Sequence, residues 1–182
     1  EERVYRHWLT NIEDWPIARQ IAWGIPIPAK VCTECHHGMV DLDNSITACT
    51  KCGGTVEHEQ DTFDTWFSSG QWPLCVTDYT GESNDFKTFY PTAVMETGKD
   101  ILFFWVARMV MLGLYRTGEV PFKKIYLHGM VRDKHGKKMS KSKGNVIAPS
   151  EIQEKYGTDA LRMGLMMNNV PGTNMDLDPD KV

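Results

Sequence analysis

The sequence has no apolar run long enough to cross a lipid bilayer. Its most apolar stretch, residues 101–115, is too short for a transmembrane helix and carries Arg108 in its interior. It also contains no signal-peptide pattern, no internal repeat and no low-complexity tract. These absences argue against an integral membrane protein and a repeat protein, and we expect a cytoplasmic protein.

An excess of positive charge is also lacking. The 182 residues hold 20 Lys and Arg against 24 Asp and Glu, which gives a net charge of −4. The chain as a whole is therefore no general binder of polyanions, and any contact with phosphate or nucleic acid must be local. With 41% apolar and 24% charged residues, the composition is that of a globular domain with a core. Because the sequence lacks an initiator Met and opens within a patterned segment, we expect it to be part of a longer protein.

Cysteine is scarce, but it is patterned. Four of the five cysteines form two Cys-x2-Cys pairs, Cys32 with Cys35 and Cys49 with Cys52, which thirteen residues separate. Each pair can hold one face of a tetrahedral metal ion, and a hairpin that returns the second pair completes a four-sulfur site. The spacing predicts a structural Zn²⁺ site, because four thiolates leave no position open for water. Two disulfides are the alternative, which a cytosolic chain disfavours.

Three further residues near this pattern are interpreted as structural. His36 and His37 are expected at the surface, because four sulfurs already fill the coordination shell. Cys75 lies outside the spacing and is expected to be a small buried residue. A zinc module of this kind does not by itself identify a function.

A strand–helix–strand pattern follows in the second half of the chain. Residues 92–96 read as a strand, residues 100–116 as a helix that is apolar nearly all round, and residues 123–131 as a second strand. Gly118 is expected to end the helix and Pro121 to prevent its continuation. This succession predicts a βαβ unit with parallel strands and a buried helix, and so an α/β fold.

The carboxyl ends of these strands predict a binding edge. Parallel strands end on the same side of a sheet, so Gly98 and Asp100 are expected beside His128 and Gly129. A glycine lets the backbone approach a ligand, the start of a helix favours anions, and a carboxylate can accept hydrogen bonds from ribose hydroxyls. Two simpler explanations stay open: Asp100 as a helix N-cap, and His128 as a strand-end histidine bonded to a neighbour.

A short cationic loop comes directly after the second strand. The segment "GKKMSKSKGN", residues 136–145, holds four lysines between Gly136 and Gly144. Mobile ammonium groups suit the stabilisation of negative charge on a departing pyrophosphate, and the flanking glycines allow the loop to close and reopen. A solvated, lysine-rich surface turn is the alternative, which the position after a βαβ unit disfavours.

The remaining residues predict two short helices and a loop. Ser150 and Gln153 have the spacing of a capping box for the first helix, and Thr158 is expected to cap the second. The polar tail, residues 172–182, is expected to be a loop.

Several of these segments resemble one family. "KMSKS", residues 138–142, resembles the second signature motif of class I aminoacyl-tRNA synthetases. "DWPIARQIAWGIPIP" resembles the element where synthetases of the valine, isoleucine and leucine group re-enter the catalytic fold after their editing insertion. "DTWFSSGQWP" and "TGKDILFFWVARM" are most similar to the valine-specific members. The resemblance covers essentially the whole chain.

The resemblance implies a fold and a division of the chain. The fold would be the C-terminal half of a Rossmann-like nucleotide-binding fold, α/β with a parallel sheet, into which a zinc ribbon is inserted. Residues 1–30 would re-enter the catalytic core, 31–60 form the ribbon, 61–148 complete the nucleotide-binding fold with the lysine loop, and 149–182 begin a helical region that contacts the tRNA stem.

The resemblance also implies roles for particular residues. The ATP phosphates would be stabilised by Lys138, Lys141, Ser140 and Ser142. The adenosine side would be formed by Gly98, Asp100, His128, Gly129 and Met130. The amino-acid side chain would lie between Trp66 and Trp105, whose indole faces form a narrow apolar slot.

The implied reaction joins valine and ATP, with Mg²⁺, into valyl-adenylate and transfers valine to tRNA(Val). Isoleucine and leucine members of the group are the alternative. A non-catalytic RNA-binding module is disfavoured, because residues 31–60 hold one lysine among five carboxylates. Two departures stand out: Ala18 replaces a frequent Ser, and the family's first signature, His-x-Gly-His, is absent. We therefore expect this polypeptide to hold half of an active site and to be inactive or very weak alone.

Overall fold

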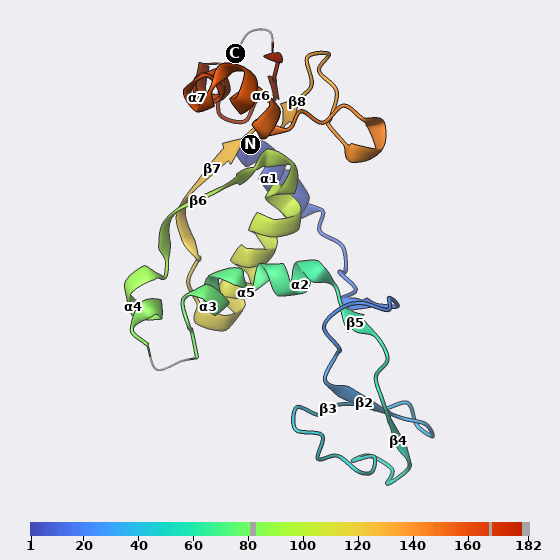
Figure 1. The fold of residues 1–182 in the computed structure, drawn as a ribbon. Helices are drawn as coiled ribbons and strands as arrows, with labels where there is room; N and C mark the ends of the chain where they lie inside the picture. Colours follow the sequence, from blue (N-terminus) through green and yellow to red (C-terminus); the bar gives the residue numbers. More distant parts are fainter. Residues whose placement is uncertain (81–82, 168, 180–182) are drawn as a thin grey trace.

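The computed structural model describes residues 1–80, 83–167 and 169–179 and has three parts along a long axis. Figure 1 shows a cysteine-bearing module at one end, a group of two helices and short strands at the other, and a pair of parallel strands with packed helices between them. Among the described residues, no helix combines the length and apolarity that a membrane crossing requires.

The central part is built on two parallel strands, β6 (Thr92–Gly98) and β7 (Phe122–His128). Their register pairs Thr92 with Phe122 and Gly98 with His128, so both strands end at the same edge. The predicted βαβ unit and the α/β fold class are therefore confirmed. The core of this part is formed by Met95, Leu102, Val106, Met109 and Phe122.

The crossover between these strands is less regular than the sequence predicts. It opens as a 3-10 turn (Lys99–Ile101), continues as a π-helix (Leu102–Ala107) and becomes α-helical only in α5 (Arg108–Thr117). Apolar periodicity in a short segment does not distinguish these helix types, because the 3-10 helix and the π-helix each differ from the α-helix by less than one residue per turn. The helix ends as expected, with Gly118 in the left-handed conformation (φ 77°) and its N–H bonded to the Leu114 carbonyl.

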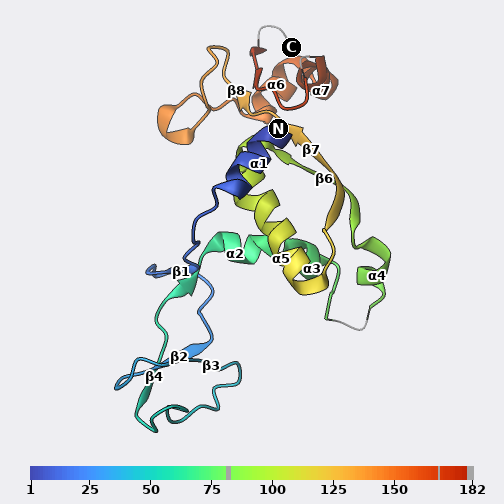
Figure 2. The ribbon, with the colours of Figure 1, turned by 180° about the vertical axis from the view of Figure 1, so that it is seen from behind.

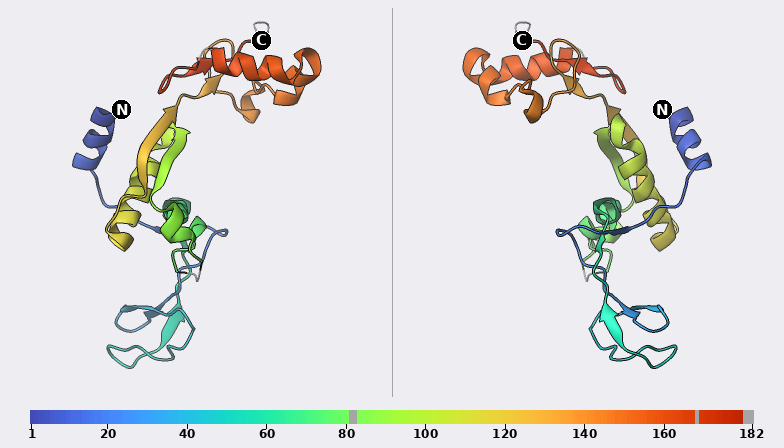
Figure 3. Two further views of the ribbon diagram at one scale, coloured as in Figure 1. Left: turned by 90° about the vertical axis from the view of Figure 1, so that its left-hand side faces the viewer. Right: turned by 90° about the vertical axis from the view of Figure 1, so that its right-hand side faces the viewer.

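The expectation that this helix is buried all round is wrong in part. One side packs against the strands, and Figure 3 shows α1 (Glu2–Thr10) beyond the helix on the other side. Trp8 of α1 stacks on Phe103 with ring centroids 5.0 Å apart. A third side has no cover within the described chain, which leaves Tyr115 89% exposed.

A narrow ribbon leads to the cysteine-bearing module. β1 (Ala18–Arg19) pairs antiparallel with β5 (Thr62–Phe63), so the chain leaves and returns at one place (Figure 2). The module itself is a three-stranded antiparallel sheet in the order β3-β2-β4, with bounds Gly38–Val40, Ala29–Cys32 and Val56–His58. It holds a buried ion pair, Lys30 Nζ to Asp41 Oδ2 at 2.9 Å.

Three short helices follow the ribbon. They are α2 (Thr65–Gly70), α3 (Trp72–Val76) and α4 (Asp85–Phe89). Cys75 of α3 is exposed, so its expected burial is wrong. The short helix buries Pro73 and turns the cysteine to the outside.

The far end of the molecule contains a strand that the sequence did not predict. β9 (Met175–Asp176) lies in the tail expected to be a loop and pairs parallel with β8 (Val131–Arg132). Met175 of β9 and Leu177 directly after it are buried, so burial alternates with a period of two within this polar segment. Leu177 packs on α6 (Pro149–Tyr156) and α7 (Thr158–Met167), with Ile152 and Leu161.

The predicted capping box of α6 is also wrong. The helix begins two residues earlier than the box requires, with Ala148 rather than Ser150 as N-cap and Pro149 in the first turn, and no side chain caps it. Proline suits this position because its fixed φ matches the helix and its missing N–H would have no partner there. α7 begins at Thr158, so the residue predicted to cap this helix is its first helical residue.

Gly129 is the point at which the tail crosses the end of β7. A Cβ at this position would lie 1.5 Å from the Thr173 carbonyl oxygen. The Met130 N–H donates to Asn174 Oδ1 (3.0 Å), and the Met175 N–H donates to the Met130 carbonyl (3.0 Å). Gly129 is therefore required for the packing of β9 on β8.

We expect Gly129→Ala to lower the free energy of unfolding by about 1–3 kcal/mol or more, because the backbone of the tail must move away from the new Cβ. Thermal unfolding and hydrogen exchange of the Met175 and Leu177 amides measure the effect. Gly38→Ala is the control, since a Cβ there meets no atom of the described chain within 4 Å. Equal melting temperatures for Gly129→Ala and the wild type would contradict this role.

Candidate functional site

The carboxyl edge of the parallel strands brings together three of the predicted residues. Gly98 and His128 are register partners, and a Cβ on Gly98 would lie 2.6 Å from Asp100 Oδ1 and 3.5 Å from His128 Nε2. Any side chain at position 98 would thus displace Asp100. The Asp100 carboxylate is exposed, and the first turn has Gly98 as N-cap with no side-chain cap bond, so the N-cap explanation of Asp100 does not hold.

His128 does have a neighbour, as the simpler explanation of this residue proposed. Its Nδ1 contacts the Glu96 carboxylate, two residues before the end of β6. His128 and Gly129 line a cavity of about 220 Å³ together with Glu96 and Tyr126 of the strands and Thr173 of the tail. Met130 lies just beyond, with both backbone polar groups bonded to the tail.

The lysine loop is anchored at its base by two side chains that the sequence did not single out. Asp133 Oδ1 accepts hydrogen bonds from the N–H groups of His135 and Lys137, both at 2.9 Å. Asn145 Nδ2 donates to Asp133 Oδ2 (2.7 Å), and Asn145 Oδ1 accepts from the Ser140 N–H (2.9 Å). One carboxylate and one amide therefore tie the start of the loop to its end.

Asp133 is 7% exposed and is held as a carboxylate. The Asn145 amide and the Lys137 N–H lower the pKa of Asp133 below its ordinary value, and they outweigh the opposing effect of burial. The signal for these anchors lay in the turn residues themselves: Asp133 precedes a turn that Gly136 closes, and Asn145 follows Gly144.

Two lysines of the loop are exposed and have no carboxylate partner among the described residues. Lys138 and Lys141 are exposed, and no carboxylate of the described residues lies within ion-pair distance of either ammonium group. Gly136 and Gly144 have positive φ values of 72° and 64°. The loop therefore presents unneutralised positive charge on a base whose backbone is fixed.

The two serines of the loop lie together within it. Ser140 Oγ and Ser142 Oγ are 2.9 Å apart and hydrogen bonded. Ser140 is the N-cap of the 3-10 turn Lys141–Lys143 and Ser142 lies within this turn, so the hydroxyls and the lysines share one short segment. The loop thus combines cationic and hydroxyl donors, a combination that suits phosphate oxygens.

The two predicted indoles lie on adjacent elements, but each ring packs on another aromatic residue. Trp66 of α2 stacks on Phe104 at 5.8 Å between centroids, and Trp105 of the π-helix meets Trp72 edge-on at 6.4 Å. The Trp105 Nε1–H donates to the Ser69 carbonyl (3.0 Å), which ties the π-helix to α2.

The four patterned cysteines converge at the tip of the module. Their Sγ atoms all lie within 4.8 Å of one another, with Cys32 to Cys52 at 3.5 Å and Cys35 to Cys49 at 3.6 Å. A tetrahedral ion with metal–sulfur bonds of about 2.3 Å requires sulfur–sulfur edges of about 3.8 Å, and a disulfide requires about 2.0 Å. The cluster fits a metal ion, and all four cysteines are free thiols rather than disulfides.

Backbone hydrogen bonds to the sulfur atoms of this cluster favour thiolates. The Lys51 N–H donates to Cys49 Sγ (3.4 Å), and the Glu34 N–H donates to Cys32 Sγ (3.4 Å). Burial disfavours the Cys49 thiolate, but hydrogen bonds from the Cys52 and Lys51 backbone and from neighbouring thiols lower its pKa to about 6. The Gly54 N–H favours the Cys52 thiolate, yet the other three sulfurs raise its pKa to about 12. A cation among the sulfurs removes this conflict, because it allows all four to ionise.

Comparison with known proteins gives a consistent result. The family model of tRNA synthetases class I (I, L, M and V) matches residues 1–178. A valine–tRNA ligase of Bdellovibrio bacteriovorus is 53% identical over 161 residues, 88% of this chain and 18% of the relative. One of Desulfotalea psychrophila is 51% identical over 180 residues, 98% of this chain and 20% of the relative. The chain spans about a fifth of the length of the curated relatives it matches.

Solved structures share the fold. A leucyl-tRNA synthetase from Agrobacterium radiobacter K84, in a ternary complex with tRNA and LeuAMS, matches 99% of this chain and 28% of its own length, with a TM-score of 0.77 and 24% identity. A Mycobacterium tuberculosis methionyl-tRNA synthetase in complex with methionyl-adenylate matches 96% of this chain and 29% of its own, with a TM-score of 0.68 and 24% identity. At this identity the likeness concerns the fold alone.

The anchoring of the lysine loop predicts a pH-dependent effect. Because the pKa of Asp133 is depressed in the folded protein, its stabilisation is fully present above the ordinary value of 3.8 and is lost as the pH falls through the lower folded value. We expect Asp133→Asn to lower the free energy of unfolding near neutral pH, and the difference from the wild type to shrink in acid. Denaturant unfolding between pH 3 and pH 7 measures it, with the exposed Asp14→Asn as control. A difference that does not change with pH would contradict the assignment.

Proposed function

We propose that this chain, which belongs to the class I tRNA synthetases (I, L, M and V), forms part of the catalytic domain of a valine–tRNA ligase. The reaction joins valine and ATP into valyl-adenylate with release of pyrophosphate, and then transfers valine to tRNA(Val). The observation that carries the proposal is identity of 44–53% to valine–tRNA ligases over 88–100% of the chain. The reaction takes place in the cytoplasm, where translation occurs.

The lysine loop acts in the first step. An oxygen of the valine carboxylate attacks the α-phosphorus of ATP, and the bond from that phosphorus to the bridging oxygen of pyrophosphate breaks. Negative charge grows on the leaving group, and the ammonium groups of Lys138 and Lys141 neutralise it. The hydroxyls of Ser140 and Ser142 donate hydrogen bonds to the same phosphates. Support comes from the exposure of both lysines and from the absence of a competing carboxylate among the described residues.

The carboxyl edge of β6 and β7 receives the adenosine. Asp100 accepts hydrogen bonds from the ribose hydroxyls, and Gly98 leaves room for the nucleotide. His128, Gly129 and Met130 border the adenine side. This assignment is supported by the convergence of Gly98, Asp100 and His128 at one edge.

Trp66 and Trp105 form the walls of the amino-acid site, and valine's branched side chain is selected by shape. The two residues lie on α2 and on the π-helix, which the bond from Trp105 to Ser69 holds together. Isoleucine and leucine enzymes of the same group are the second candidate, and the higher identity to valine enzymes favours the first.

The cysteine cluster holds a structural Zn²⁺. Four thiolates satisfy a tetrahedral ion completely, and the observed sulfur–sulfur distances fit that geometry. ATP enters the reaction as a substrate accompanied by Mg²⁺. The chain divides into four segments. The re-entry segment is 1–30 and the zinc module is 31–60. The nucleotide-binding half is 61–148, and the stem-contact region starts with 149–182.

We expect Lys141→Ala, in the full-length enzyme that contains this chain, to slow valine-dependent ATP–pyrophosphate exchange by about 10²–10³-fold, because one charged group that stabilises the leaving group is lost. The KM for valine should change little, since the lysine does not contact the amino acid. Lys123→Ala removes an exposed lysine of β7 and is the matched control. Exchange at the wild-type rate in Lys141→Ala would refute this role, and exchange with isoleucine or leucine in place of valine would refute the substrate assignment.

Removal of the metal tests the cysteine cluster. Metal analysis should find about one zinc per chain in the wild type and none in Cys49→Ser or after strong chelation. Amides of β2 and β4 should then exchange faster with solvent, because the ion no longer joins the two cysteine pairs. Cys75→Ser is the control, since this exposed cysteine lies outside the cluster. Full zinc content in Cys49→Ser, or an unchanged module without zinc, would show the assignment to be wrong.

A further inference from the structure

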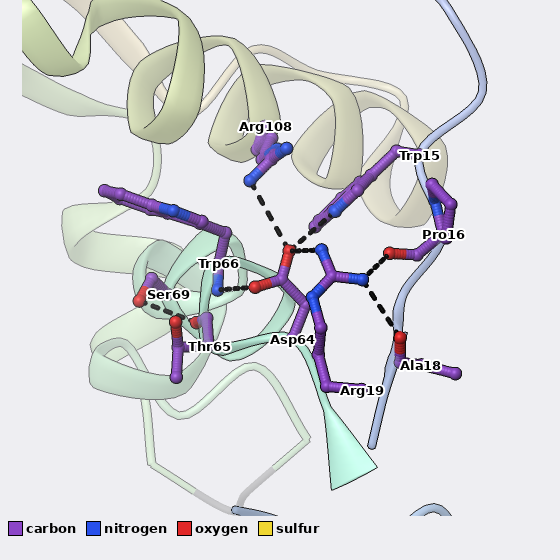
Figure 4. Close-up of polar contacts among 9 residues, drawn as sticks. All are labelled: Trp15, Pro16, Ala18, Arg19, Asp64, Thr65, Trp66, Ser69 and Arg108. Atoms are coloured by element: carbon purple, nitrogen blue, oxygen red, sulfur yellow. Dashed lines mark hydrogen bonds and ion pairs between the residues drawn. The ribbon is translucent and has the colours of Figure 1, made fainter. Parts of the chain in front are cut away.

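A single carboxylate joins three separate parts of the chain beside the proposed amino-acid site. Asp64 is 6% exposed and lies just before α2. Figure 4 shows donors directed at it from the segment before the cysteine module, from α2 and from α5. Trp15 Nε1 donates at 2.7 Å, Arg19 Nη2 at 3.0 Å and the Trp66 N–H at 3.3 Å.

Arg108 completes this group, which we call the Asp64 cluster (Trp15, Arg19, Asp64 and Arg108). Its Nη1 lies 3.8 Å from Asp64 Oδ2, close enough for an ion pair and too far for a hydrogen bond. Its guanidinium lies over the Trp15 ring at 3.8 Å and is 5.5 Å from the centre of Phe104. The arginine is therefore enclosed by aromatic rings, and its position depends on the one carboxylate that neutralises it.

The Asp64 cluster touches the elements that carry both indoles. Asp64 caps α2 through the N–H of Trp66 itself. Arg108 is the first residue of α5 and directly follows the π-helix that holds Trp105. α2 and α5 also approach closely at Gly70, where a Cβ would lie 2.8 Å from Leu112 Cδ1. Asp64 and Arg108 therefore join the start of α2 to the end of the π-helix, the two elements that carry Trp66 and Trp105.

We propose that Asp64 and Arg108 are positioning residues that set the spacing of Trp66 and Trp105 and thereby the selection of valine against larger aliphatic side chains. This inference rests on the proposed function of the two indoles as walls of the amino-acid site. A slot that rejects one additional methylene discriminates by only about 10–200-fold, so a small change in its width has a measurable effect. Neither residue contacts the reacting atoms in this assignment.

The test uses adenylation by the full-length enzyme with valine and with isoleucine. Asp64→Asn keeps the size of the side chain and removes the charge. Arg108→Met keeps most of the volume and removes the cation. Both should lower the ratio of kcat/KM for valine to that for isoleucine by about tenfold, mainly through a higher KM for valine, while the KM for ATP stays constant. Arg108→Lys should restore part of the ratio, because a charge returns beside Asp64.

Two further variants separate positioning from stability. Asp41→Asn removes a buried, ion-paired carboxylate in the cysteine module and should lower the melting temperature without changing the valine-to-isoleucine ratio. Trp15→Phe removes the indole donor to Asp64, keeps an aromatic ring beneath Arg108 and should shift the ratio in the same direction as Asp64→Asn, by less. It provides a folded variant if Asp64→Asn does not fold.

The result that overturns the inference is an unchanged ratio and an unchanged KM for valine in Arg108→Met and Trp15→Phe. A wild-type enzyme that activates isoleucine or leucine in place of valine refutes the proposed substrate instead. In that case the positioning role is judged by the same variants on the amino acid that the enzyme does activate.

Discussion

The parallel pairing of β6 with β7 positions the residues at the carboxyl edge of the central part. It brings Gly98 and His128 to the same edge, although 29 residues of crossover and strand separate them in the chain. β7 then leads directly into Gly129 and the lysine loop, so the carboxyl edge of the two strands and the cationic loop follow one another in the chain. A slip of one residue in this register would turn His128 and Glu96 to opposite faces and remove their contact.

The lysine loop combines a hydrogen-bonded backbone at its base with exposed lysine side chains. Asp133 and Asn145 bind the backbone at both ends of the loop, and Ser140 is held from within. Lys138 and Lys141 form no ion pair with a carboxylate of the described chain. The base of the loop is therefore ordered by folding itself, while these side chains are left exposed.

The Asp64 cluster gives the cysteine module a connection with the rest of the fold. The module leaves the core after Arg19 and returns at Thr62, and Arg19 and Asp64 are bonded across that junction. The same carboxylate caps α2 and faces Arg108. The insertion is therefore closed at its neck by the group that orders the aromatic residues of the central part.

The features that could be predicted are those with a signal in consecutive segments of the chain. The cysteine spacing predicted a four-sulfur cluster, Gly118 predicted the end of a helix, and the strand–helix–strand pattern predicted parallel pairing. Contacts between segments far apart in the chain could not be read from the sequence. The strand β9 and the need for glycine at position 129 both follow from such contacts, between the end of β7 and the tail. The anchoring by Asp133 and Asn145 and the convergence on Asp64 have the same origin: a buried carboxylate takes whichever donors the fold brings to it, and sequence spacing does not record which they are.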